Sequence, residues 1–369
     1  MKKGIALIKE MKEKNQMKKK KSQWYNLRPV LGCANWAMFF VLLGARETGK
    51  SYAVTNFFVD QFVEKGIPFV WLRLTDRQSQ KLLQNNAERL VDPDIKRKYN
   101  LDLVTNGTNV YQVTKRSEPD KNGKTKILEK KLMARVLNLS TFYTDKGSIF
   151  DKDFLNDPNM RYNIACDEFE REKGEKNTFD ILYALVNQLE NLVRSTKERV
   201  KVFFMGNTLE EASDILAAFN FIPEQFGLYK LKKRRAVIHY IAPSELYLER
   251  RKGTIADILM PTASTFTNSI NLDNSLICKD RLVAPVAVVK FTKDRKDWFT
   301  IWNNNIVTFY NGEKGKPVFA MRPYLDELYS VDRMNSMIQL FDTRSLQFRT
   351  MIAFKRFQSE MSLLKPRGK

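Results

Sequence analysis

The sequence predicts an α/β fold with a largely parallel sheet, followed by a smaller α+β domain. Over the first 240 or so residues, apolar runs typical of buried parallel strands alternate with segments of helical periodicity. A glycine-rich loop joins the first of these strands to the first helix. The remainder contains short β-type runs and a basic helical tail, and a length of 369 residues suits two domains of roughly 100–200 residues each.

The predicted elements follow from local composition. The apolar run AMFFVLL at 37–43 predicts a central strand, and phenylalanines at helical spacing predict a helix over 51–64. The lysine-rich stretch 96–136 has short β runs around Asn122-Gly123, a pair that favours a hairpin turn. The other predicted elements are strands at 69–74, 136–139, 162–166, 200–205, 286–291, 298–302 and 306–310, and helices at 76–90, 178–193 and 244–259.

The charge balance indicates a polyanionic partner. Lys and Arg number 63 against 42 Asp and Glu, a formal charge of +21, which predicts nucleic acid first and an acidic membrane surface second. The single histidine excludes His-metal clusters and Ser/His/Asp triads, and three widely spaced cysteines argue against disulfides and zinc sites. No apolar run reaches the roughly 20 residues of a membrane span, so we expect a soluble cytoplasmic protein without a membrane partner.

The strongest chemical signal is GARETGKS at 44–51, a complete GxxxxGK[ST] phosphate-binding loop, or P-loop. Gly44 lets the chain turn off the strand, and Gly49 lets backbone N–H groups close around phosphates at the start of a helix. Lys50 is expected to reach the β- and γ-phosphates, and the Ser51 hydroxyl to ligate Mg²⁺. The predicted nucleotide-binding residues are Gly44, Ala45, Arg46, Glu47, Thr48, Gly49, Lys50 and Ser51.

Two adjacent acids, Asp167 and Glu168, follow the predicted strand at 162–166. Asp167 would hold Mg²⁺ through its water shell, and Glu168 would polarise the attacking water. The long separation from the P-loop leaves room for another strand and helix, which suits the ATPases with an additional strand and a catalytic Glu (the ASCE group) rather than small G proteins. The sequence has no guanine-reading NKxD motif, which favours ATP over GTP.

Two further polar residues have alternative explanations. Asn207 ends the predicted strand at 200–205 and either senses the γ-phosphate or simply forms a turn. Arg194 follows the predicted helix at 178–193, where it either crosses a subunit boundary to neutralise transition-state charge or satisfies the helix dipole. The residues alone leave both pairs of alternatives open.

Several blocks in this order and spacing resemble the genome-packaging ATPases of phi29-like bacteriophages. The similarity covers about residues 24–310 and rests on GARETGKSY at 44–52, LSTFYTDKG at 139–147, DEFEREK at 167–173, ERVKVFFMGN at 198–207, Tyr25-Asn26 and ERRK at 249–252. Members of this family form a ring motor at the portal vertex and couple ATP hydrolysis to pumping double-stranded DNA into the procapsid. They work with a portal protein and, in one case, a packaging RNA.

The resemblance implies roles for individual residues. Lys50 and Ser51 carry over as phosphate and Mg²⁺ contacts, and Asp167 and Glu168 as the Walker B acid and the catalytic base. Arg194 matches a trans-acting arginine finger, and Lys146 a lysine offered to the neighbouring subunit's nucleotide. It also implies ATP and Mg²⁺ as cofactors, and a homo-oligomeric ring (a pentamer) acting in the host cytoplasm at the portal vertex and absent from the mature virion.

The expected domains are a basic extension at 1–26, a P-loop ATPase domain at 27–243, a linker or lid at 244–276 and a C-terminal domain at 277–369. By resemblance, the last is an RNase H-like nuclease domain that has lost cutting, since its strand at 286–291 contains no acid. The candidate nucleic-acid contacts, or else solvated basic faces, are Lys121, Lys124, Lys126, Lys232, Lys233 and Arg234. The alternative functions are a nucleic-acid ATPase with an active nuclease, a small-molecule phosphotransferase and a binding scaffold without catalysis.

Overall fold

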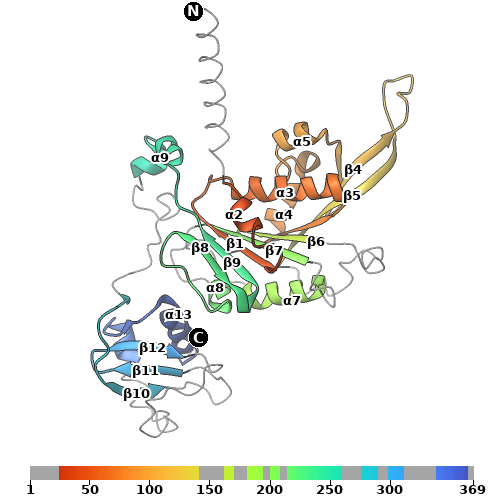
Figure 1. Cartoon of the computed structure of the whole chain (residues 1–369). Helices are drawn as coiled ribbons and strands as arrows, with labels where there is room; N and C mark the ends of the chain where they lie inside the picture. The colour runs from red at the N-terminus through yellow and green to blue at the C-terminus, as the bar shows by residue number, and fades with distance from the viewer. Residues whose placement is uncertain are drawn as a thin grey trace, which may run out of the picture. The chain divides into compact units, whose positions relative to one another are not determined.

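The computed structural model describes residues 25–140, 162–169, 181–193, 200–207, 214–259, 276–289, 298–310 and 338–364 (Figure 1). The chain forms two compact units. The first comprises Met1–Thr208 and Gln225–Ser269, and the second comprises Leu209–Glu224 and Ile270–Lys369. Residues 214–224 therefore pack in the second unit, although they lie inside the range 27–243 predicted for the ATPase domain.

The first unit is built on a sheet whose described strands follow the order β3-β4-β5-β2-β6-β7-β1-β9-β8. The run from β5 to β9 is parallel, and antiparallel strands flank it on both sides. The prediction of an α/β fold with a large, mostly parallel sheet is thus confirmed. The strands are β1 Phe39–Leu43, β2 Phe69–Arg73, β3 Leu103–Asn106, β4 Asn109–Arg116, β5 Ile127–Asn138, β6 Tyr162–Asp167, β7 Val200–Gly206, β8 Gly227–Leu231 and β9 Ala236–Tyr240.

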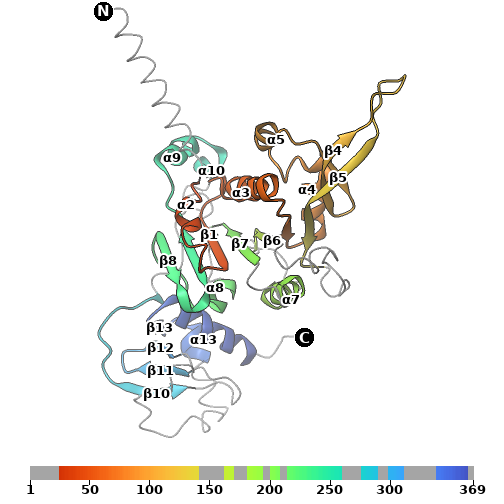
Figure 2. The same cartoon turned by 45° about the vertical axis from the view of Figure 1, so that its right-hand side comes forward.

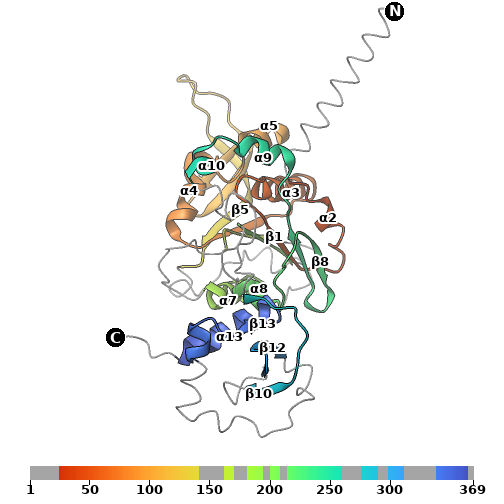
Figure 3. The same cartoon turned by 90° about the vertical axis from the view of Figure 1, so that its left-hand side faces the viewer.

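Helices α3 and α7 cover opposite faces of this sheet, as Figures 1 to 3 agree. Strands with a helix on each face must be apolar on both sides, which explains the continuous apolar runs in β1, β2, β6 and β7. The helices in the described residues of this unit are α2 Arg28–Leu31, α3 Lys50–Lys65, α4 Asp76–Ala87, α5 Pro93–Tyr99, α7 Ile181–Val193, α9 Glu245–Arg251 and α10 Ile255–Leu259.

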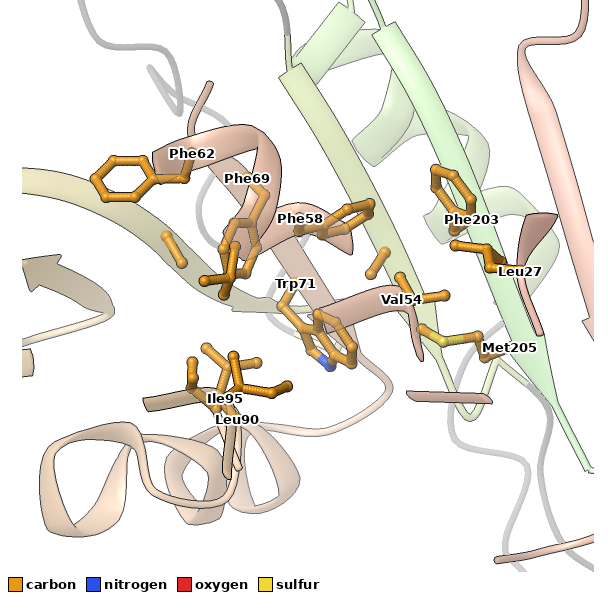
Figure 4. Close-up of a cluster of buried hydrophobic side chains, with 14 of the residues drawn as sticks. Leu27, Val54, Phe58, Phe62, Phe69, Trp71, Leu90, Ile95, Phe203 and Met205 are labelled. Atoms are coloured by element: carbon orange, nitrogen blue, oxygen red, sulfur yellow. The ribbon is translucent and has the colours of Figure 1, made fainter. Parts of the chain in front are cut away.

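The core between α3 and the sheet is aromatic (Figure 4). Phe58 of α3 is fully buried, and its ring lies 5.3 Å from the rings of both Phe69 and Phe203. Trp71 of β2 packs edge-on against Phe58 at 6.4 Å. This packing fixes α3, and with it the preceding loop, on β2 and β7.

The lysine-rich stretch forms the hairpin that the Asn-Gly pair predicts, between β4 and β5. Gly123 has φ 73°, and the Asp120 carboxylate accepts hydrogen bonds from the backbone N–H groups of Asn122 and Lys124. β5 is longer than predicted because the outer leg of the hairpin continues without a break into the buried strand beside β2. The predicted helix at 76–90 instead ends at Ala87, after Asn85 and Asn86 adopt left-handed conformations.

The second unit contains a smaller sheet with the order β10-β11-β12-β13. Its elements are β10 Pro285–Val289, β11 Trp298–Trp302, β12 Ile306–Tyr310, β13 Gln347–Phe348, α8 Asp214–Ala218 and α13 Met351–Leu364. Phe299, Phe348 and Phe357 form its core. The short helix α8 joins this unit through Arg356, which donates to the Ala217 carbonyl at 2.8 Å, and through Lys355, 3.1 Å from the Asp214 carboxylate.

None of the helices in the described ranges combines the length and the apolar composition needed to cross a bilayer.

Candidate nucleotide-binding site

The P-loop connects β1 to α3 at the edge of the sheet where the parallel strands end. Two of its glycines are required by geometry. Gly49 caps α3 with a left-handed backbone, φ 85°. This conformation is unfavourable for residues that carry a Cβ atom. A Cβ at Gly44 would lie 3.2 Å from the Ile241 side chain, so the strand end and the segment after β9 approach closely. The loop therefore presents its backbone N–H groups at a helix N-terminus.

Lys50 is buried inside this loop. Its Nζ donates to the carbonyl oxygens of Gly44 and Ala45 at 2.9 and 2.7 Å and lies 3.3 Å from Thr48 Oγ1. Burial lowers the pKa of the Lys50 ammonium to about 8, although Asp167 and Glu168 oppose the shift. The Lys50 ammonium is thus held inside the loop by carbonyl oxygens, the kind of acceptor that phosphate oxygens can replace.

Asp167 and Glu168 lie at the end of β6, and β7 separates β6 from the P-loop strand β1. That intervening strand is the arrangement expected of the ASCE group. Ser51 Oγ donates to Asp167 Oδ1 at 3.1 Å, so the P-loop helix and the acidic strand are in direct polar contact. Burial raises the pKa of Asp167, whereas Arg73, Ser51 and Lys50 act against the rise and Glu168 adds to it.

The residues present fit a magnesium ion. Mg²⁺ takes oxygen ligands and is usually held by one or two protein side chains together with substrate phosphates and water. Ser51 and Asp167 bring a hydroxyl and a carboxylate oxygen together at the end of the P-loop. In the described residues no group of three or more His, Cys, Asp or Glu side chains forms a separate metal cluster.

Arg73 is a member of the site that the sequence analysis missed. It is the last residue of β2, the strand beside β6. Its Nη2 lies 3.1 Å from Asp167 Oδ2, and its Nη1 forms an ion pair with Glu168 Oε2. Glu168 has a left-handed backbone with φ 51°, which turns the chain sharply after Asp167. A polar residue directly after the apolar run at 69–72 was the available signal, and it is the same kind of signal that identified Asp167.

Of the three other predicted site residues, Asn207, Lys146 and Arg194, the structure describes Asn207. Asn207 follows β7 and is at the same sheet edge as the P-loop and the two acids. Gly206 before it is needed because a Cβ there would come within 2.9 Å of the Phe169 ring. Lys146 and Arg194 fall outside the residues that the structure describes.

The candidate nucleic-acid contacts lie at the opposite edge of the sheet. Lys121, Lys124 and Lys126 are exposed in the tip of the β4–β5 hairpin, which protrudes from the rest of the first unit (Figures 1 and 2). The hairpin leads into the part of β5 that pairs with the start of β2. Lys232, Lys233 and Arg234 form the turn before β9, again where a parallel strand begins. The sheet therefore separates both basic segments from the P-loop.

Tyr25 anchors the start of the described chain beside the P-loop. Its backbone N–H donates to the Thr48 carbonyl at 3.1 Å, and its hydroxyl lies 2.9 Å from Nδ1 of His239 on β9. Burial raises the pKa of the Tyr25 phenol and lowers the pKa of His239, so the neutral forms are favoured. Tyr25 thus ties the P-loop to the strand next to β1.

Taken together, the strand order, the P-loop and the acidic pair define a P-loop nucleotide-binding protein with an additional strand between the two motifs. The chain belongs to the podovirus DNA encapsidation protein (Gp16) family, whose model matches residues 19–342. This confirms the resemblance to the genome-packaging proteins of phi29-like bacteriophages.

Two sequence relatives are both DNA packaging proteins of Bacillus phages. The chain is 26% identical over 291 residues to the DNA packaging proteins of Bacillus phage phi29 and Bacillus phage PZA, covering 77% of this chain and 74% of each relative. Two solved structures share the fold. The Phi-28 gp11 DNA packaging motor matches with a TM-score of 0.57 and 13% identity, over 94% of this chain and 99% of that one. The bacteriophage Phi-29 genome packaging motor assembly matches with a TM-score of 0.55 and 19% identity, over 92% of this chain and 100% of that one.

Replacing Arg73 with Met should destabilise the protein through charge. Asp167 is buried, and removing the cation from a buried ion pair typically costs about 3–5 kcal/mol. The loss in the free energy of unfolding should be smaller at about pH 5 than at about pH 7.5, because burial raises the pKa of Asp167 and its protonation removes the charge that Arg73 compensates. Urea titrations at both pH values measure it. Arg97→Met, which breaks an exposed ion pair with Asp94, is the control and should cost under about 1 kcal/mol. An equal loss at both pH values would mean that Arg73 stabilises by packing alone.

His239 should give the protein a measurable stability change in mildly acidic solution. Its pKa is lower in the folded than in the unfolded chain, so the unfolded chain binds the proton more readily and stability falls as the pH drops below about 6.5. The melting temperature between about pH 7.5 and 5.5 measures this. Because His239 is the single histidine, His239→Asn should flatten this part of the profile. An unchanged slope in the variant would contradict the assignment.

Proposed function

We propose that the protein is the ATP-hydrolysing motor that translocates double-stranded viral DNA through the portal into a procapsid, working as a homo-oligomeric ring. The observation that supports this most directly is the contact between Ser51 and Asp167, with Lys50 and Glu168 beside it, at one edge of the sheet. Family membership and the similarity to DNA packaging proteins of two Bacillus phages support the choice of substrate.

The roles of the residues follow from their chemistry. Lys50 and the P-loop N–H groups bind the β- and γ-phosphates of ATP, and Ser51 and Asp167 hold Mg²⁺. When bound, the ion offsets negative charge on the phosphate oxygens. Glu168 orients a water molecule for attack, and Asn207 is placed at the strand end beside the P-loop strand, where it can sense the γ-phosphate. Arg73 holds Glu168 in place through their ion pair. When the attacking water binds, the Glu168 carboxylate either keeps this ion pair or replaces it with a contact to the water.

Hydrolysis in this proposal needs a neighbouring subunit. Arg194 supplies a positive charge to the next subunit's γ-phosphate, and Lys146 contacts the same nucleotide. A cation contributed across a subunit boundary couples turnover to assembly, because an isolated subunit lacks it. We propose a pentameric ring that works with the portal protein, and with a packaging RNA if one is present, in the host cytoplasm at the portal vertex, and that is absent from the mature virion.

DNA contact is assigned to the basic segments away from the P-loop. A motor must hold DNA whatever its sequence, and contacts between lysines and phosphates do this. The β4–β5 hairpin with Lys121, Lys124 and Lys126 is one such segment, and the turn of Lys232, Lys233 and Arg234 is the other. The second unit, with the strand PVAVV at 285–289 that lacks acidic residues, is proposed to be the RNase H-like domain that binds nucleic acid without cutting it.

The ATPase assignment predicts distinct effects of three substitutions in the full chain. Lys50→Ala should abolish nucleotide binding. Glu168→Gln should keep binding but lower kcat by about 10²–10⁴-fold, as expected when a general base is removed. Arg194→Ala should lower turnover by about 10³-fold in assembled rings and have no effect on the basal rate of the monomer.

Phosphate release measured against protein concentration, with and without DNA, tests these effects. Wild-type turnover should rise steeply as rings form. Glu88→Gln, an exposed change after α4 and outside the basic segments, is the charge control and should behave as wild type. Normal hydrolysis by Glu168→Gln would contradict the catalytic assignment, and normal hydrolysis by Arg194→Ala in rings would contradict the trans-acting finger.

The DNA assignment predicts a change in salt dependence. Replacing Lys121, Lys124 and Lys126 with Gln should weaken duplex DNA binding and reduce the slope of log K against log salt by about 2–3, since each lost phosphate contact removes about 0.9. Replacing exposed Arg77, Lys81 and Arg89 with Gln removes the same charge elsewhere and should leave the slope nearly unchanged. Fluorescence anisotropy across a salt series measures both, and equal slopes for the two triple variants would contradict the hairpin contact.

A further inference from the structure

Helix α9 lies beside the P-loop. Ile241, between β9 and α9, donates its backbone N–H to the Leu43 carbonyl at 2.8 Å, and its side chain is the one that meets Gly44. Ser244 caps the N-terminus of α9 through the backbone N–H of Tyr247. The chain after β9 therefore follows the start of the P-loop before the helix begins. The ERRK block at 249–252, which the proposed function leaves without a role, is at the other end of this helix.

Arg251, in this block, contacts the P-loop itself. Its Nη1 lies 3.5 Å from Oε2 of Glu47, and its side chain is 13% exposed whereas that of Glu47 is 73% exposed. Buried Tyr247, one turn earlier, is within range of both charges. Burial raises the pKa of the Tyr247 phenol, Arg251 acts against the rise and Glu47 adds to it. The guanidinium therefore lies near the phosphate-binding loop, one helical turn after the buried Tyr247 side chain.

Glu47 is an unusual neighbour for a polyphosphate. Its backbone has φ 61°, so the acid is part of the turn that wraps around phosphates. A carboxylate there repels an anionic ligand, and solvent weakens that repulsion because the Glu47 side chain is mostly exposed. A nucleotide polyphosphate carries several charges and accepts the two-pronged hydrogen bonds of a guanidinium, so it competes strongly with one exposed carboxylate for Arg251.

We propose that Arg251 is a nucleotide-binding residue that Glu47 holds beside the P-loop: the guanidinium pairs with Glu47 and transfers to the polyphosphate when a nucleotide binds. The proposal rests on the proposed function in requiring that the P-loop binds ATP. It gives α9 a direct response to nucleotide, because the contact that holds the end of the helix changes partner.

A simpler explanation is that Arg251 only balances the charge of Glu47. Both explanations predict that Arg251→Gln weakens nucleotide binding, since it leaves Glu47 unpaired. They differ in the double variant. If Arg251 only balances charge, removing both partners restores wild-type affinity. If Arg251 binds the polyphosphate, the double variant stays weak.

The test is the affinity of the full chain for a fluorescent ATP analogue with Mg²⁺. Arg251→Gln should bind about 30-fold more weakly, within the range for losing a hydrogen bond to a charged group. Glu47→Gln should bind about twofold to threefold more tightly, because repulsion and competition are removed. Glu47→Gln with Arg251→Gln should remain about tenfold weaker than wild type. Lys252→Gln, the same charge change at an exposed neighbouring residue, should match wild type.

Each outcome has a distinct meaning. A double variant within about twofold of wild type would overturn the proposal and leave only charge balance. Absence of binding by wild type and Lys252→Gln would contradict the proposed function itself. Melting temperatures establish that the variants fold. Should Arg251→Gln unfold, Arg251→Lys in the Glu47→Gln background keeps the charge without the planar fork, and affinity equal to that of Glu47→Gln would again overturn the proposal.

Discussion

The structure depends on the mutual compensation of charges at the carboxyl edge of the main sheet. Lys50 and Asp167 are both buried, and either charge alone would be costly to remove from water. Ser51 bonds Asp167, and Arg73 bonds both Asp167 and Glu168. These contacts join β2, β6 and α3 at one place, so the same groups that would bind a nucleotide also fix the relative positions of the elements that present them.

The aromatic core and the polar edge depend on each other. Phe58 holds α3 against β2 and β7, which keeps Ser51 at the first turn of the helix within reach of Asp167. The basic hairpin and the turn before β9 lie at the other edge of the sheet. The turn before β9 is therefore at least one strand length, about 17 Å for five residues, from the acids proposed for catalysis. The hairpin lysines lie farther away, because β5 begins at Ile127 and pairs with the start of β2 only from Ala134.

How much could be predicted from the sequence differs between the parts of the site. The P-loop, Asp167 and Glu168 follow from a motif and from apolar runs that end in polar residues, because buried parallel strands and their carboxyl ends leave a local pattern. Arg73 could not be assigned in this way, because its role requires that β2 lies next to β6. The sequence of a single segment does not reveal which strands are neighbours in the sheet. Arg251 is a similar case: its partner Glu47 is 204 positions earlier and is met only through the path of the chain after β9. α8 belongs to the second unit because it packs against α13, which lies far away in the sequence. A helix of five residues has no local pattern that would indicate this partner.

The membership of α8 in the second unit has a consequence for dissecting the protein. The polypeptide passes between the two units three times, after Thr208, after Glu224 and after Ser269. A C-terminal fragment beginning at residue 277 would therefore lack α8, which is part of the second unit. In that fragment Arg356 and Lys355 would lose their contacts with Ala217 and Asp214. The two halves of this chain are interleaved in sequence, and a single cut at a presumed boundary yields one incomplete unit rather than two whole ones.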